Sequence, residues 1–273
     1  MRTIFIIYLF CLTLAGSSVA AQNQNKEATE SIIKTKRSRF VVGIRSGYSH
    51  MLASADAGIK DAISAGATQQ GAENYYDKLK KGFHFSADAH YMIVDFVGAG
   101  VKYSLFSSSS DIDMTAKASS SYSILPPPSY LYYCIGYDER MYVNFVAPSF
   151  VFRQRIGKTA RISEKIAVGY AGYRSEVRAK ADLLPTQKYS NMLAEGGNIA
   201  LNPEVMFEVF PTKWLSVGLS AGYFNFTVKK MKLKAQSPGS TSLDIIETEI
   251  KLEKDKYETL SRIDLSLGLN FHF

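Results

Sequence analysis

The chain has 273 residues, 46% of them hydrophobic, and its 32 Lys and Arg against 25 Asp and Glu give a formal net charge of +7 at pH 7. Excess positive charge favours contact with phosphate-bearing surfaces, although solvated loops carry such charge equally well. No nucleic-acid-binding motif accompanies it, so we expect no nucleic acid partner.

The first 21 residues have the pattern of a secretory signal peptide. Arg2 precedes an apolar run over residues 4–15, and small residues stand before Gln22. The run is shorter than an ordinary membrane-spanning helix needs. No later segment is apolar and long enough to form such a helix either. We therefore expect residues 1–21 to direct export and then to be removed.

If residues 1–21 direct export, the rest of the chain divides into two parts. Residues 22–38 are polar and predict a periplasmic linker, and residues 39–273 predict a single folded domain with no separate peptidoglycan-binding domain after it. The exported chain keeps one cysteine, Cys134, so it forms no internal disulfide. Its stability must come from its own core or from a membrane.

Eight segments alternate apolar and polar residues and are bounded by turn-forming residues, which predicts eight β-strands. Two prolines disturb the pattern. The fourth segment loses its alternation near Pro148, which predicts a β-bulge, and Pro203 counts against a flawless sixth strand. The predicted strands are residues 39–49, 82–93, 96–106, 140–155, 165–177, 198–210, 214–224 and 261–273.

The connections between these strands alternate strictly between short and long. The four long ones are residues 51–81, 107–139, 178–197 and 228–256. A transmembrane barrel sorts its loops in this way, and hydrocarbon requires the strands to close into a ring. We predict an all-β fold, an eight-stranded antiparallel up-and-down transmembrane β-barrel with long extracellular loops and short periplasmic turns. A soluble lipocalin-like barrel or β-sandwich is the alternative.

The two faces of the predicted strands differ in chemistry. One is apolar and would face lipid, whereas the other is rich in Gly and Ser with scattered charge and would face a narrow lumen. Because unpaired charge in such a lumen is unfavourable, we expect a salt-bridge network that blocks it; an ordinary wet lumen with loose ion pairs is the alternative. Arg174 is placed on the lumen face as well. The predicted structural network comprises Arg45, Asp88, Lys102, Glu204, Glu208, Arg262 and Asp264.

Aromatic residues near the predicted strand ends indicate girdles at the two membrane interfaces. The outward girdle would comprise Tyr48, Phe106, Tyr142 and Tyr223.

Three polar residues of the second predicted strand share one face and raise the question of a metal site. They are His84, Asp88 and His90. Side chains two residues apart on a strand are about 7 Å apart, so neighbouring strands would have to supply the convergence. We interpret them as members of a hydrogen-bonded lumen. No Ser–His–acid pattern stands out, and we expect no metal, no cofactor, no catalytic residues and no enzymatic activity.

The long connections differ from one another in composition. The first is Ala-rich and predicts a short helix at residues 61–67 or 75–80. The second combines a Ser-rich tract, a Pro run and a Tyr cluster, which suits a recognition surface or a loop without a partner. The last has a Lys-rich and a Glu-rich arm around Ser237-Pro238-Gly239, which predicts a protruding antiparallel hairpin with Lys opposite Glu.

The end of the chain resembles bacterial outer-membrane β-barrel proteins. It reads "LSLGLNFHF", an alternating strand with a terminal Phe. The strand number resembles small members such as the OmpA membrane domain and OmpX. Two hairpins resemble those of Bacteroidetes-type outer-membrane barrels, "YVNFVAPSFVFRQRIGKTARISEKIAVGYAGY" and "LNPEVMFEVFPTKWLSVGLSAGYF". The resemblance implies that the barrel-assembly machinery reads the last strand, with Phe271 and Phe273 as assembly signal and anchor.

From these features we expect a monomeric protein of the bacterial cell outer membrane. Its expected role is structural or interactive, in envelope integrity, adhesion or recognition through the outward loops. Expected partners are outer-membrane lipid and lipopolysaccharide, the barrel-assembly machinery, and a surface ligand or host protein. A small porin-like channel for polar solutes is the first alternative, and a membrane-embedded lipid-modifying enzyme is the second.

Overall fold

The computed structural model describes residues 39–119, 130–157, 159–183, 186–236, 245–252 and 258–273. Internal contacts divide the chain into two units, Met1–Arg39 and Phe40–Phe273. The second unit holds every strand and helix discussed below. The predicted signal peptide and linker lie outside the described residues and stay predictions.

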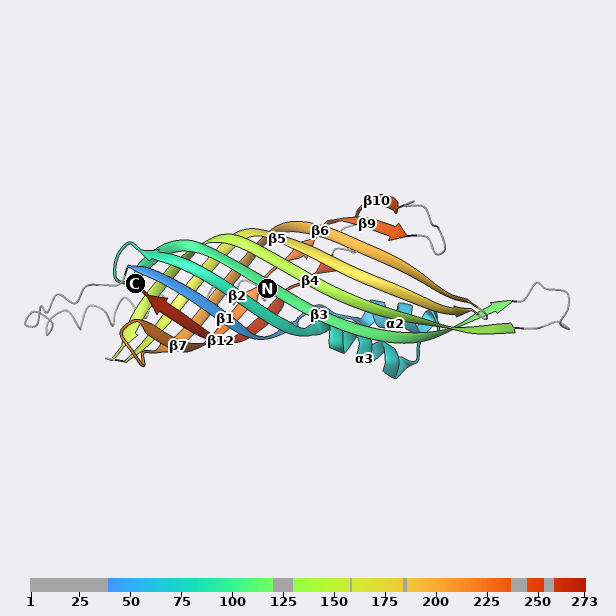
Figure 1. The fold of residues 1–273 in the computed structure, drawn as a ribbon, viewed down its shortest axis with the longest axis horizontal. Helices are drawn as coiled ribbons and strands as arrows, with labels where there is room; N and C mark the ends of the chain where they lie inside the picture. Colours follow the sequence, from blue (N-terminus) through green and yellow to red (C-terminus); the bar gives the residue numbers. More distant parts are fainter. Residues whose placement is uncertain (1–38, 120–129, 158, 184–185, 237–244, 253–257) are drawn as a thin grey trace, which may run out of the picture. The chain divides into compact units, whose positions relative to one another are not determined.

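Eight long strands form a closed antiparallel ring (Figure 1). Each pairs with the next along the chain, and β12 pairs with both β7 and β1, which completes the closure. The all-β, eight-stranded prediction is confirmed. The ring comprises β1 (Phe40–Met51), β2 (Lys81–Met92), β3 (Val97–Ser119), β4 (Tyr130–Ile156), β5 (Ala160–Leu183), β6 (Thr186–Val209), β7 (Leu215–Phe224) and β12 (Arg262–His272).

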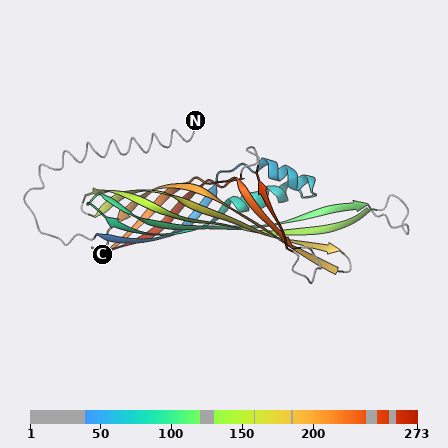
Figure 2. The ribbon, with the colours of Figure 1, turned by 90° about the horizontal axis from the view of Figure 1, so that it is seen from above.

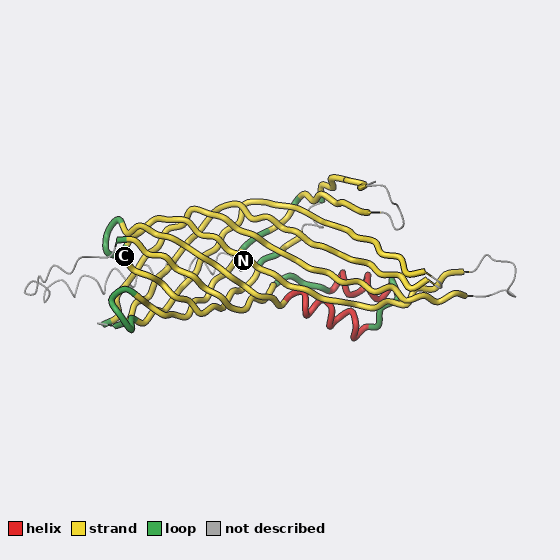
Figure 3. Tube along the Cα trace, viewed as in Figure 1, coloured by secondary structure: helices red, strands yellow, loops and turns green. Residues whose placement is uncertain are grey.

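Four of the ring strands continue well past the other four. The β3–β4 pairing runs on from Ser107 opposite Tyr142 to Ser119 opposite Tyr130, and β5–β6 pairing reaches Leu183 opposite Thr186. Much of two predicted loops is therefore strand, visible as the long arms in Figures 1 and 3. The outer face of these segments is polar, and their inner face mixes Ser with apolar residues such as Ile112, so alternation alone missed them. We call this continuation of β3 to β6 the outward sheet.

The last long connection adds two strands to the outward sheet. β9 (Lys230–Gln236) pairs with β6, and β10 (Ile245–Lys251) pairs with β9. The register sets Lys234 opposite Glu247 and Lys232 opposite Glu249, so the predicted Lys-opposite-Glu hairpin is present. The predicted turn at Ser237-Pro238-Gly239 lies outside the described residues.

Two short strands stand apart from the ring sheet. β8 (Thr227–Val228) and β11 (Glu258–Thr259) pair with each other as a separate two-stranded sheet. They lie in sequence between the ring strands and the hairpin arms. The hairpin is therefore not an uninterrupted continuation of the last two ring strands.

The predicted bulge at Pro148 is wrong. The β3–β4 register runs without a shift through Val101 opposite Pro148, and the β4–β5 register keeps one offset on both sides of that proline. Phe145 and Val151 are both buried and share one parity. Proline lacks an N–H, so β4–β5 pairing skips it, but the strand needs no extra residue to accommodate it.

A broad apolar band surrounds the outside of the ring. Each ring strand contributes outward side chains that are large, apolar and exposed; one from each strand, in chain order, is Ile44, Phe83, Val101, Val146, Val168, Ile199, Leu219 and Leu267. β7 has 10 residues and β12 has 11, which matches the length of about 9–11 residues that a tilted strand needs to cross a bilayer.

The inside of the ring is filled, and it has two layers. Towards the short turns it is polar, with small and charged side chains. Towards the outward sheet it is apolar, contrary to the expected Gly- and Ser-rich lumen. This upper layer belongs to one buried cluster, whose ring-strand members include Phe106, Val143, Phe145, Tyr173 and Phe224; Phe226 and Val228, which follow β7, belong to the same cluster. Phe106 is fully buried here, so its predicted place in the outward girdle is wrong; it stands one residue beyond outward-facing Leu105 and has the opposite parity.

Two helices lie beside the outward sheet (Figures 1 and 2). They are α2 (Asp56–Ser64) and α3 (Gln69–Lys80). α3 contains the predicted stretch 75–80, whereas α2 contains residues 61–64 of the predicted stretch 61–67 and ends before the rest. Thr68 caps α3, with its side-chain oxygen accepting a hydrogen bond from the Gly71 N–H at 3.0 Å. Ala62, Tyr75 and Leu79 belong to the same buried cluster as the upper lumen, so the helices cover the inward face of the outward sheet.

Among the described residues, no helix is long and apolar enough to cross a membrane.

Candidate functional site

The centre of the polar lumen is a five-residue ion network. Asp88 contacts the Arg45 guanidinium, and its Oδ2 lies 2.9 Å from the Lys165 Nζ. Glu204 accepts from the Lys102 Nζ at 2.5 Å and lies 3.2 Å from the Arg45 Nε. All five side chains are buried. Three cations therefore share two carboxylates, which satisfies the requirement that buried charge be paired.

Local sequence explains why the long Arg45 side chain fits across the lumen. Gly268 stands opposite it on β12, and a Cβ at that position would overlap the Arg45 side chain. Gly43 is likewise next to Asn270 and Asp88, where a Cβ would meet their oxygens. The absence of a side chain at Gly43 and Gly268 makes the room that the Arg45–Asp88 contact occupies.

A second charged pair marks the boundary between the polar and the apolar layer. Arg262 donates from its Nε to the Asp264 Oδ1 at 2.8 Å, and Asp264 also accepts from Ser49. The Arg262 guanidinium carbon lies 4.0 Å from the centre of the Phe224 ring and 5.0 Å from that of Phe106. The positive charge of Arg262 is thus balanced by the Asp264 carboxylate, and its guanidinium group also contacts two aromatic rings.

The third centre is Glu208, which stands apart from the other carboxylates. It accepts hydrogen bonds from Ser163 at 2.5 Å and Ser216 at 2.7 Å. Ser216 in turn lies 3.0 Å from the His272 Nε2. The seven predicted network residues are therefore all buried, but they divide among three centres.

Sequence reasoning misplaced one lumen charge and missed another. The side chain of Arg174 is half exposed on the outside of the outward sheet, where it pairs with Glu176 at 2.7 Å. Lys165 is the buried cation of that strand. The signal was present, because Lys165 shares its parity with the small residues Ala167 and Ala171, whereas Arg174 shares the parity of lipid-facing side chains.

The lumen histidines contact both serines and aspartates. The His90 Nε2 lies 2.8 Å from the Ser149 Oγ, and its Nδ1 lies 3.2 Å from the Asp88 Oδ1. This atom order is that of a hydrolytic triad, which the sequence did not reveal. Ser149 and His90 are almost fully buried, however, and Asp88 is already held by two cations. The contacts therefore describe a packed, hydrogen-bonded group of almost fully buried side chains.

The other histidine of β2 makes similar contacts. His84 lies 2.9 Å from the Ser266 Oγ through Nδ1 and 3.7 Å from the Asp264 Oδ2 through Nε2. In the part of the chain that the structure describes, no three His, Cys, Asp or Glu residues converge as metal ligands would.

The helices are fastened to the outward sheet by one hydrogen-bonded latch. The Tyr75 hydroxyl on α3 donates to Glu139 on β4, and the Ser175 Oγ on β5 donates to the same carboxylate at 2.6 Å. Burial, together with the charge of Glu139, raises the pKa of Tyr75 well above its usual range. Tyr75 therefore stays a hydrogen-bond donor, and α3 is held against two strands at once.

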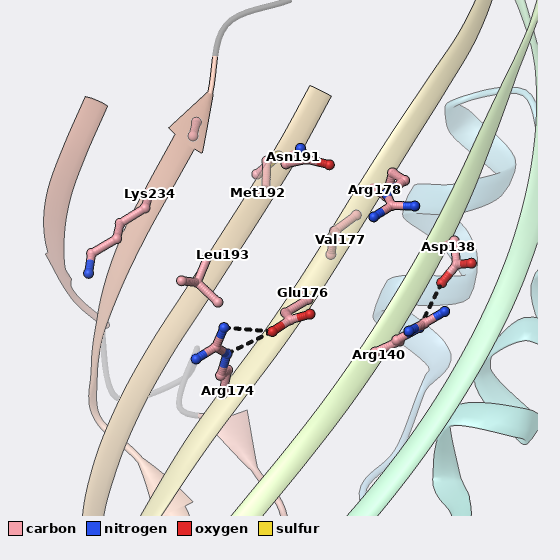
Figure 4. A pocket seen from close by; sticks show the side chains of 11 residues that line it. Asp138, Arg140, Arg174, Glu176, Val177, Arg178, Asn191, Met192, Leu193 and Lys234 are labelled. Atoms are coloured by element: carbon pink, nitrogen blue, oxygen red, sulfur yellow. Dashed lines mark hydrogen bonds and ion pairs between the residues drawn. The ribbon is translucent and has the colours of Figure 1, made fainter. Parts of the chain in front are cut away.

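The outer side of the outward sheet is charged and hollowed (Figure 4). It encloses a pocket of about 350 Å³. Met192 and Leu193 form apolar parts of the lining, and Arg178 makes no ion pair with any described residue. We call this surface the outer charged face and define it by Asp138, Arg140, Arg174, Glu176, Arg178 and Lys234.

Much of the predicted Tyr-rich recognition surface lies outside what the structure describes at side-chain level. Tyr137 is the exception, and it packs against the buried cluster instead of standing free. Among the described residues, charged and apolar side chains lie together on the outer charged face, which sequence reasoning did not single out.

The two aromatic residues predicted as an assembly signal lie at the seam of the ring. The Phe271 ring stacks on Trp214 with the ring centres 6.3 Å apart. The backbone of Phe273 exchanges two hydrogen bonds with Phe40, at 2.8 and 3.1 Å, while its side chain is exposed. The backbone of Phe273 thus contributes to the closure between β12 and β1, and its phenyl group lies in the outward-facing apolar row.

Comparison with known proteins gives likeness in fold. No protein-family model matches the chain, and no curated protein matches it. Among solved structures it is similar to a major outer membrane protein from Thermus thermophilus (12% identity, TM-score 0.49, 86% of this chain and 98% of that chain). It is also similar to Neisserial surface protein A (12%, 0.39, 86% and 97%) and to the outer membrane protease OmpT from Escherichia coli (9%, 0.41, 87% and 98%). One of these structures is a protease, so the likeness assigns no activity.

Proposed function

We propose that this protein is an integral outer-membrane β-barrel with a structural and surface-interaction role. The observation that carries the proposal is the apolar band that surrounds a closed eight-stranded ring. An exposed apolar surface of that extent is unfavourable in water and matches the lipid-facing surface of a transmembrane barrel. The signal-peptide pattern and the terminal Phe273 support an outer-membrane location. Lipid and lipopolysaccharide would contact the band, and the assembly machinery would read β12.

The filled lumen supports a closed barrel over the porin-like alternative. A polar layer of paired charges is followed by an aromatic layer, and the helices cover the outward end of that layer. The outer charged face and its pocket support interaction with a surface ligand or a host protein, because they combine charge with apolar lining.

Fractionation and conductance test this proposal together. We expect the protein to sediment with the outer membrane and to require detergent for extraction. It should migrate differently on gels before and after heating, and as a monomer. In planar bilayers it should give no large steady conductance. Solubility without detergent would overturn the membrane assignment, whereas steady conductance would favour the channel.

A further inference from the structure

The turn end of the lumen carries three arginines on one hairpin. Arg153 and Arg155 lie on β4 and Arg161 lies on β5, where Arg155 is directly opposite Arg161 and Arg153 is opposite Ser163. All three positions have the inward-facing parity, as the buried neighbours Val151 and Ser163 show. They therefore gather at the mouth of the lumen, below the ion network.

Arg153 differs from the other buried cations of the barrel. It is only 8% exposed, yet it makes no hydrogen bond or ion pair with the described residues through its side chain, and its Nε is buried without an acceptor. By contrast, each of the four other buried cations reaches a carboxylate; these cations are Arg45, Lys102, Lys165 and Arg262. A buried guanidinium without a counter-charge is unfavourable by several kcal/mol.

The nearby acidic residue does not supply the missing partner. Both carboxylate oxygens of Glu208 are engaged, by Ser163 and Ser216. Among the described residues Arg161 makes no ion pair with a carboxylate either; its guanidinium carbon lies 4.6 Å from the centre of the Phe210 ring, and that ring lies 5.1 Å from His272. Three guanidinium groups thus stand near the single negative charge of Glu208, which accepts hydrogen bonds from two serines, so positive charge is in excess at this end of the lumen.

We propose that this mouth is a binding site for an oxyanion of the phosphate class. Arg153 would be the buried residue that binds the oxyanion. Arg161, whose guanidinium lies over the face of the Phe210 ring, would be the second. A guanidinium donates two parallel hydrogen bonds to phosphate oxygens, and the partly buried setting strengthens them. The phosphate could be free or part of a phospholipid head group in the adjoining leaflet. The lipid source rests on the membrane assignment proposed above; the site itself does not.

Titration of the full chain with inorganic phosphate tests the site without a membrane. The protein would be refolded in a phosphate-free detergent and titrated by calorimetry. We expect saturable binding that Arg153→Gln weakens at least tenfold and Arg153→Lys weakens less, because lysine keeps the charge but loses the paired donors. Lys60→Gln, which removes an exposed cation on α2 away from both the lumen mouth and the outer charged face, is the control and should leave affinity unchanged.

A second variant gives an effect of the opposite sign. Glu208→Gln removes the negative charge beside the site, so phosphate should bind several-fold more tightly. Gel migration before and after heating checks that every variant is folded. A loss of structure alone would weaken binding in both Arg153→Gln and Glu208→Gln. Equal affinity in Arg153→Gln and Lys60→Gln, or no binding by the wild-type protein to phosphate or to phospholipid, would overturn the proposal.

The two sources are separated in nanodiscs of phosphatidylglycerol and of a phosphate-free galactolipid. If the head group is the natural ligand, phosphatidylglycerol should abolish phosphate binding, and native mass spectrometry should find phospholipid retained by the wild-type protein but not by Arg153→Gln. If the ligand is free phosphate, affinity should be the same in both discs and no lipid should be retained.

Discussion

At the scale of single residues, the lumen is organised around Arg45. It contacts Asp88 directly and lies 3.2 Å from Glu204, and these carboxylates also hold Lys165 and Lys102. Glycine at position 268 leaves the space that the side chain crosses. Arg45 thus links both carboxylates, whereas Lys165 and Lys102 each contact only one of them.

Replacing Arg45 by Ala should destabilise the barrel strongly. The substitution leaves Asp88 with Lys165 and Glu204 with Lys102, but it empties the space of a large, fully buried side chain and removes that side chain's contacts with both carboxylates, which should cost about 2–5 kcal/mol. The expected result is a lower midpoint of urea unfolding for protein refolded in liposomes. Arg174→Ala is the control, because that arginine pairs with Glu176 at the exposed surface and should change stability by less than about 1 kcal/mol. Equal effects of the two substitutions would argue against a central role for Arg45.

The placement of individual side chains also shows which of them could be predicted from the sequence. Alternation placed Arg45, Asp88 and Glu204 inside correctly, because each lies within a strand whose parity is clear. It failed at Arg174 and Phe106, which stand where a strand passes from the ring into the outward sheet. There the outer row changes from apolar to charged and the inner row becomes aromatic, so hydrophobicity no longer indicates the lipid side.

At the scale of elements, the eight ring strands follow from the sequence because a lipid-facing row imposes strict alternation. The outward sheet does not follow, since water on its outer side removes that constraint. The prediction of a bulge at Pro148 was also wrong. A proline at a strand position where no N–H is needed for pairing leaves the β3–β4 and β4–β5 registers unchanged. Pairing partners beyond the membrane band depend on contacts between distant segments, such as β6 with β9.

The latch between α3 and the outward sheet makes a testable prediction. Tyr75→Phe removes one donor from Glu139, so the helix pair should be released more readily, by about 1–2 kcal/mol. Hydrogen exchange of the α3 amides would measure this, with Tyr76→Phe on the same helix as the control.

The latch should also respond to alkali. Because the folded pKa of Tyr75 is raised, the stabilisation is fully present below the usual tyrosine pKa of about 10 and is lost as the pH rises above it. Protection of α3 that falls equally at high pH in Tyr75→Phe would argue against this origin.

The end of β12 carries a second prediction at this scale. Phe273→Ser should lower the amount of assembled barrel in the outer membrane, because the residue is proposed as an anchor and as part of the assembly signal. Quantifying the heat-modifiable band in membrane fractions would measure it. Phe273→Tyr keeps an interfacial aromatic and should assemble nearly normally. Undiminished assembly of Phe273→Ser would remove this role from the residue.

At the scale of the whole molecule, the strand pairs that close the barrel and the strand pairs of the outward sheet are formed by different residues. β2–β3 pairing ends at Phe83 opposite Ser107, whereas the β3–β4 hairpin continues beyond it; the described part of this hairpin pairs with β5 and contacts α3. Replacing residues 109–140 by Asn-Gly, a two-residue hairpin turn, should therefore leave a folded, heat-modifiable barrel.

The same replacement should abolish binding of any ligand that uses the outer charged face. It removes Asp138 and Arg140 from the pocket and Glu139 from the latch. A barrel that fails to fold after this change would show that the outward sheet is needed for closure. Replacing residues 178–191 in the same way, on the neighbouring hairpin, joins Val177 to its partner Met192 and makes a matched comparison.

The one-sided continuation of β3 to β6 also sets a direction. A sheet that continues a barrel wall stands upright on the membrane, so its outer charged face looks along the membrane plane and not away from the cell. The inward face is occupied by α2 and α3. In the proposed location, the pocket beside Arg178 would therefore be reached more readily by molecules embedded in the same membrane than by molecules from solution. Its partners would then approach parallel to the membrane plane.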